Sequence, residues 1–157
     1  MKQEEGVGLV EIVIAVGVIA ATFFAIAQVG ILAMNGARDR NEKVRALAFA
    51  QEGIEAVRTI RDATWSGNIA TLSFGSTYYA TTSSDHWILT ASNPGLLDGT
   101  FTRTVVVDNV ARDINDDIVV VGGTDDLGTK KVTVTVSWGS PQKSVQLLAY
   151  LTNILKN

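Results

Sequence analysis

Apolar side chains fill one long stretch near the start of the chain. Residues Val7–Met34 read VGLVEIVIAVGVIAATFFAIAQVGILAM, and Glu11 is the only ionisable side chain among them. The stretch exceeds the ~20 residues that span a hydrocarbon core, and at ~1.5 Å rise per residue it would form a helix about 42 Å long. A carboxylate at membrane depth costs ~2.5–3.5 kcal/mol, so we expect Glu11 to have a functional partner.

A charged segment, Arg38–Lys43, follows this stretch and separates it from a second helical pattern. Beyond it, apolar residues return at helical spacing: Val44, Leu47, Ala48, Ile54 and Val57. This pattern predicts one helix from about Val7 to Asp62, with a bend near Gly30 or Gly36. Its second half is amphipathic and is expected to pack on another element.

Beyond Ala63 the chain becomes rich in Gly, Ser, Thr and Asn, and short β-branched runs replace the helical pattern. Strands are predicted at Ile69–Phe74, His86–Leu89, Thr102–Asn109, Ile118–Val121, Val132–Trp138 and Val145–Leu151. Residues 132–138 alternate strictly between apolar and polar, as a strand with one buried face does. Gly139–Pro141 supplies a turn to the last strand. The predicted fold class is α+β: a long N-terminal helix, amphipathic and long enough to be transmembrane, followed by an antiparallel β-sheet domain.

Composition argues against several classes of function. With 157 residues the chain has room for one domain plus an anchor, and its net charge of −3 argues against a nucleic-acid-binding surface. Cysteine is absent and His86 is the only histidine. A thiol nucleophile and a thiolate metal site are therefore excluded, and a His-centred catalytic site would depend on one residue. We expect neither catalytic residues nor a cofactor.

An acidic segment raises the question of calcium. Asp113, Asn115 and Asp117 present oxygen ligands at alternate positions, as the opening of a calcium loop does. The sixth position, however, is Ile118 instead of glycine, and the twelfth is Thr124 instead of glutamate. A solvated acidic turn between strands is therefore the favoured interpretation, with calcium as the alternative.

Two further features have ordinary interpretations that outweigh functional ones. His86 is expected to begin a strand, since no second histidine is available as a metal ligand. Six aromatic residues could form a stacking surface for sugars or bases, although aromatic residues of a sheet domain usually lie in the core. They are Trp65, Tyr78, Tyr79, Trp87, Trp138 and Tyr150.

The N-terminal motif Gly6-Val7-Gly8-Leu9-Val10-Glu11 resembles that of the type IV pilin superfamily. In that motif a glycine precedes a hydrophobic residue, and a glutamate is the fifth residue after the glycine. The resemblance implies that prepilin peptidase cuts between Gly6 and Val7 and methylates the new Val7 amine. Two further blocks, residues 50–58 (AQEGIEAVR) and the hairpin that begins with 132–138, look like those of minor pilins, the pilus modification proteins.

This resemblance divides the chain into four parts. Residues 1–6 would be the leader, 7–34 the transmembrane and filament-core half of the helix, 35–62 the half that packs on the sheet, and 63–157 the β domain. The precursor would cross the cytoplasmic membrane once and become part of an extracellular filament. Its implied partners are other pilin subunits, prepilin peptidase and the inner-membrane assembly platform. Basic residues at 38–45 would by charge alone favour the opposite orientation in the membrane.

The spacing of Val7 and Glu11 has a physical consequence once the cut is assumed. Four residues separate them, so they lie on one helical face, and the new amine is a cation in apolar surroundings. In a bundle of staggered helices the glutamate of one subunit can neutralise the amine of its neighbour, which disfavours misaligned helices. Small residues around it suit close helix packing: Ala15, Ala20, Ala21, Ala25 and Ala27.

Three alternatives stay open at this point. The chain could be a pseudopilin of a type II secretion system, or a membrane-tethered binding or adhesion module that never polymerises. A tethered enzyme is the least favoured, because the sequence offers no paired carboxylates at a useful spacing on an identified element.

Overall fold

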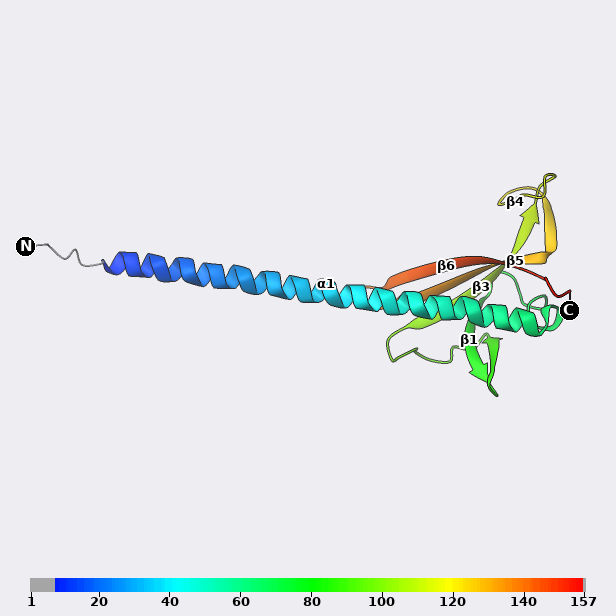
Figure 1. Ribbon diagram of the computed structural model, residues 1–157, viewed down its shortest axis with the longest axis horizontal. Coiled ribbons are helices and arrows are strands. Elements are labelled where there is room, and N and C mark those ends of the chain that lie inside the picture. Colours follow the sequence, from blue (N-terminus) through cyan, green and yellow to red (C-terminus); the bar gives the residue numbers. More distant parts are fainter. Residues whose placement is uncertain (1–7, 157) are drawn as a thin grey trace, which may run out of the picture. The chain divides into compact units, whose positions relative to one another are not determined.

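A long helix followed by an antiparallel sheet makes up the fold, which confirms the predicted class (Figure 1). The computed structural model describes residues 8–156. In chain order the elements are α1 (Leu9–Ala63), α2 (Trp65–Asn68), β1 (Thr77–Ser83), β2 (His86–Thr90), β3 (Thr102–Arg112), β4 (Ile118–Val119), β5 (Thr124–Trp138) and β6 (Lys143–Thr152).

Helix α1 contains 55 residues and continues without interruption through Gly30 and Gly36. Its observed end, Ala63, lies one residue beyond the predicted end. The chain divides into two compact units, the first ending at Glu42 and the second beginning at Lys43, and α1 contributes to both. The second unit contains the sheet and the last part of the helix.

The core of the second unit lies between one face of α1 and one face of the sheet. Helix residues that are buried recur three and four positions apart, as expected for a single helical face: Ala46, Ala50, Gly53, Ile54, Ala56, Val57 and Ile60. On the sheet side the buried residues are Phe101, Val105, Val107, Val132, Val134, Val136 and Trp138. In β5 the buried valines alternate with Thr and Ser, so this strand has one apolar and one polar face. The alternation is less regular in β3, where Arg103 lies on the inner face and Val106 on the outer face.

Gly53 lets the helix approach the sheet closely. A Cβ atom at this position would lie 2.8 Å from Val134 Cγ1 and 2.9 Å from Arg103 Cδ, both shorter than an ordinary contact. The block at residues 50–58 therefore has a packing explanation: its small and apolar members face the sheet, while Gln51, Glu52 and Arg58 are exposed.

The strands form one six-stranded sheet in the order β2-β1-β3-β5-β6, with β4 paired to the end of β3. Every pairing is antiparallel. The predicted C-terminal hairpin is confirmed; β5 begins earlier than predicted, at Thr124, and β6 extends beyond both of its predicted ends. The register between β3 and β5 shifts at Asn109 and Val110, where β5 contains extra residues.

One predicted strand is wrong and one observed strand was not predicted. Residues 69–74 form turns after α2, and Ile69 donates its backbone N–H to the Trp65 carbonyl at 3.0 Å. Ile69 is fully buried, so its apolar character reflects core packing and not a strand. The true first strand, β1, carries mostly Thr, Tyr and Ser, which gives little apolar alternation to detect.

Candidate functional site

The apolar part of α1 is solvent-exposed along its whole length. Every described residue from Gly8 to Asn41 is exposed, including large side chains such as Leu9 (79%) and Phe23 (71%). By length and composition this helix can cross a membrane. So much exposed apolar surface is unusual for a protein in water and indicates burial in lipid or against other chains.

Glu11 lies in the first turn of α1, where a negative charge is favourable to the helix dipole. Its backbone N–H donates to the Gly8 carbonyl at 2.9 Å, so the helix is already established at this point. The side chain is exposed among Val and Ile residues. Gly6 and Val7, the residues of the inferred cleavage junction, lie outside the described residues.

The exposed helix has two different faces, because successive residues are rotated by about 100°. One face continues from Glu11 through small and medium-sized residues: Ala15, Val18, Thr22, Ala25, Val29, Ala33 and Gly36. We call this the Glu11 face. The Thr22 hydroxyl donates to the Val18 carbonyl at 2.8 Å, so its polar group is satisfied within the helix.

The opposite side of the helix carries bulkier side chains, and we call it the Phe face. It contains Leu9, Val13, Val16, Ala20, Phe23, Phe24, Ala27, Ile31 and Met34. The five alanines predicted to favour close packing are therefore not equivalent, since Ala15 and Ala25 lie on the Glu11 face and Ala20 and Ala27 on the Phe face. Small residues on one face let two helix backbones come close together.

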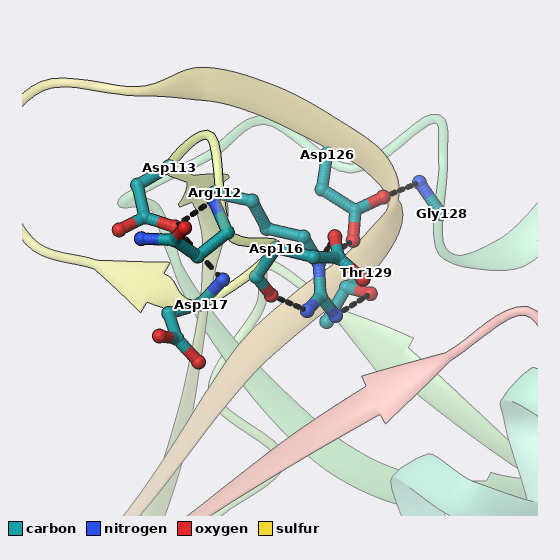
Figure 2. A network of polar contacts seen from close by, with 8 residues as sticks. Arg112, Asp113, Asp116, Asp117, Asp126, Gly128 and Thr129 are labelled. Carbon is teal, nitrogen blue, oxygen red and sulfur yellow. Dashed lines mark hydrogen bonds and ion pairs between the residues drawn. The ribbon is translucent and has the colours of Figure 1, made fainter.

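A cluster of polar side chains surrounds Arg112 at the C-terminal end of β3 (Figure 2). Arg112 Nε donates to Asp126 Oδ2 at 2.7 Å, and one terminal nitrogen donates to the Asp116 carbonyl at 2.7 Å. The other terminal nitrogen is 3.5 Å from the Thr129 hydroxyl. The register shift in β5 brings Asp126 and Thr129 to the same arginine.

This arrangement shifts the pKa of both charged partners. Hydrogen bonds from Thr129 and from Arg112 stabilise the ionised carboxylate and lower the pKa of Asp126 to about 2. The hydrogen bond to Asp126 raises the pKa of Arg112. Both changes favour the ionised forms of Arg112 and Asp126. Their ion pair connects the C-terminal end of β3 to β5.

The candidate calcium ligands have a structural role next to this pair. Asp113 Oδ1 accepts hydrogen bonds from the backbone N–H groups of Asn115 (2.8 Å) and Asp117 (3.0 Å), which closes the turn between β3 and β4. Within residues 8–156, no group of three or more acidic or histidine side chains is arranged to hold a metal ion. The Arg112 guanidinium contributes positive charge to this region, and calcium binding stays an untested alternative to the solvated acidic turn.

Arg103 is a buried charged residue that the sequence pattern did not predict. Its side chain is 3% exposed, and its terminal nitrogens donate to the carbonyls of Phe49 in α1 and Ala80 in β1, each at 3.1 Å. Glu52 lies 3.5 Å away, and the guanidinium lies 5.4 Å from the centre of the Trp87 ring. Its place among alternating apolar residues of β3 was the available signal, because that spacing puts residue 103 on the inner face.

His86 begins β2, as predicted, and is exposed. The aromatic residues are divided between core and surface. Trp65 and Trp138 are buried, Tyr78, Tyr79 and Trp87 are half-buried, and Tyr150 is exposed. The expected core role thus holds for two of the six in full, and the others leave parts of their rings accessible.

Comparisons with known proteins add nothing to this geometry: no family model, curated protein or solved structure matches the chain. A function therefore has to be inferred from the helix, its charge and the sheet that follows it.

Proposed function

We propose that this chain is a structural subunit of a type IV pilus or related filament, of the minor-pilin kind. The precursor is inserted in the cytoplasmic membrane by α1 and is cleaved after Gly6. It then assembles through the same helix into a filament that carries the β domain on its outside. The function is assembly and involves no catalytic turnover.

The single observation that supports this proposal most is the contrast between the two parts of α1. Residues 8–41 present exposed, mostly apolar side chains, whereas the last part of the same helix buries one face against the sheet. A plain membrane anchor needs only ~20 apolar residues and no continuation into a folded domain. A helix that is continuous from an apolar segment into a domain core suits a subunit whose domain is displayed from a helical filament core.

Glu11 supports assembly over simple anchoring. Cleavage after Gly6 would create an amine at Val7, and a carboxylate one helical turn away can neutralise it in the same chain or in the next. Leaving either charge unpaired among apolar helices is costly, so a subunit out of register is disfavoured. The Glu11 face, with its small residues, lets the helix that supplies the partner approach closely.

Substitution of the glutamate tests this role. Glu11→Ala is expected to leave membrane insertion intact and to reduce incorporation into filaments at least tenfold, because the amine loses its partner. Quantitative immunoblotting of sheared filaments and of membranes measures the two pools. Glu55→Ala, which removes an exposed carboxylate of the same helix, serves as the matched control and is expected to leave incorporation unchanged. Normal incorporation of the Glu11 variant would contradict the proposal.

A secretion pseudopilin and a tethered binding module are the competing functions. We prefer a minor pilin over a pseudopilin because of the blocks at residues 50–58 and 132–138. A tethered module would keep residues 1–6 and would stay in the membrane fraction, so the same fractionation separates it from a filament subunit.

A further inference from the structure

A cavity of about 630 Å³ lies in the second unit, between the end of α1, the α2 turn and strand β2. Its apolar residues include Ile60, which is buried, and Leu72, Trp87 and Leu89, which are half-buried. Of its polar residues, Asn68 is half-buried, whereas Thr59, Thr71, Asp85 and His86 are exposed. The cavity thus combines apolar walls with a polar rim, as small-molecule sites do.

Most hydrogen-bond donors on the rim already donate to backbone carbonyls of the protein. The Thr59 hydroxyl donates to the Glu55 carbonyl at 3.0 Å, and the Thr71 hydroxyl donates to the Gly67 carbonyl at 2.9 Å. Each hydroxyl keeps its oxygen as an acceptor. The Asn68 amide donates to the Ile60 carbonyl at 3.1 Å and keeps its own carbonyl oxygen.

His86 and Asp85 add two stronger acceptors. His86 Nδ1 lies 2.6 Å from the Ser84 carbonyl, which can only accept, so Nδ1 carries the hydrogen. In the neutral ring Nε2 is then an acceptor. Asp85 contributes an exposed carboxylate. The rim therefore offers several acceptors and one negative charge.

Trp87 supplies an aromatic surface to the cavity wall and is half-buried. The Arg103 guanidinium lies over its ring, 5.4 Å from the centre, so the ring already takes part in one cation contact within the protein. Aromatic faces attract ammonium groups by the ring quadrupole, and tryptophan does so best.

We propose that this cavity binds a small organic amine in its ammonium form. The ammonium group donates to Asp85 and the neighbouring acceptors, and the carbon skeleton covers Ile60, Leu72 and Trp87. A polyamine and an amino sugar share this chemistry. The proposal concerns the second unit alone and holds whether or not the chain forms a filament.

Calorimetric titration of the full-length protein in non-ionic detergent at 0.15 M salt tests the site. The amine ligands are cadaverine and glucosamine, and the neutral counterparts are 1,5-pentanediol and N-acetylglucosamine. We expect one amine per chain, with an association constant at least tenfold above that of its neutral counterpart. The amine with the larger association constant shows whether the site takes a polyamine or an amino sugar.

Asp85→Asn is the decisive variant. Ser84 and Asp85 have φ values of 48° and 63° in the two-residue turn between β1 and β2, and asparagine suits such a turn, so the variant keeps the fold. It is expected to weaken amine binding about tenfold. Asp125→Asn removes the same charge away from the cavity and is expected to leave binding unchanged. Equal binding of amine and neutral ligands, equal weakening by both variants, or no binding of either amine at millimolar concentration would each overturn the proposal.

Discussion

At the scale of single residues, Arg112 and Asp126 illustrate how one ion pair can organise a strand end. The arginine reaches across the register shift to a carboxylate and a hydroxyl of β5, and to the backbone of the turn that follows β3. Sequence alone shows a cluster of acidic residues here, which favours a solvated turn and leaves calcium as the alternative. It does not show that an arginine from the adjacent strand end lies at the centre, because the strand register decides that contact.

The Asp126 pair predicts a specific acid sensitivity. Its pKa is lowered from 3.8 to about 2, so the ionised carboxylate contributes stability that is complete above about pH 4 and is lost as the pH falls through 2. Asp126→Asn is expected to reduce the pH dependence of the unfolding free energy in this window by about 1 kcal/mol, allowing for partial solvent screening. Denaturant unfolding at pH 4 and pH 2 measures it. Asp125→Asn is the control, and identical pH profiles for the two variants would contradict the assignment.

Gly53 gives a prediction in which two effects oppose each other. Alanine in a helix interior is favoured over glycine by ~1 kcal/mol, but a Cβ here would collide with the stiff Val134 side chain. Because overpacking costs ~1–3 kcal/mol, Gly53→Ala is expected to lower the unfolding free energy by about 1 kcal/mol. Gly36→Ala, whose Cβ would meet open space, is the control and is expected to leave the unfolding midpoint unchanged or raised. A stabilised Gly53 variant would show that the helix does not pack this closely.

At the scale of elements, the sequence predicts best where one periodicity lasts for many residues. The apolar run and the helical spacing beyond it predict α1 almost to its last residue, and strict alternation predicts the β5–β6 hairpin. The predictions fail where burial is irregular. Ile69 is apolar because a turn packs it into the core, while β1 is a strand of mostly polar and aromatic residues, which gives little apolar alternation to detect although its partner β2 follows directly in the sequence.

The functional residues likewise differ in how far the sequence alone reveals them. Glu11 stands out in the sequence because it is a charge inside an apolar run, and no tertiary information is needed to notice it. Arg103 is one basic residue among many until the fold places it between α1 and β1. The cavity beside His86 is equally hidden, since its walls come from the helix end, a turn and a strand.

The two faces of α1 lead to a prediction about assembly. Ala25 lies on the Glu11 face and Ala27 on the Phe face, at nearly the same depth along the helix. Ala25→Leu is expected to reduce filament incorporation several-fold, because the larger side chain keeps a neighbouring helix from approaching. Ala27→Leu adds the same volume among bulky residues and is expected to have little effect. Incorporation measured in sheared fractions decides between them, and equal effects would contradict a preferred packing face.

At the scale of the whole molecule, one chain contains two units with different requirements. The first unit needs an apolar environment for its exposed helix, and the second has its own core and a sheet whose outer face is mostly polar. In the proposed function, a membrane would meet the first requirement before assembly, and a bundle of neighbouring helices would meet it afterwards. The proposed cleavage connects the two states, because it removes residues 1–6 and leaves an amine beside the glutamate.

The N-terminus of polymerised protein tests this central claim most directly. Intact-mass and peptide mass spectrometry of sheared, cell-derived filaments is expected to show chains that begin at N-methylated Val7 and lack residues 1–6. Filament chains that still begin at Met1 would contradict the account, since no new amine would then exist for Glu11 to neutralise.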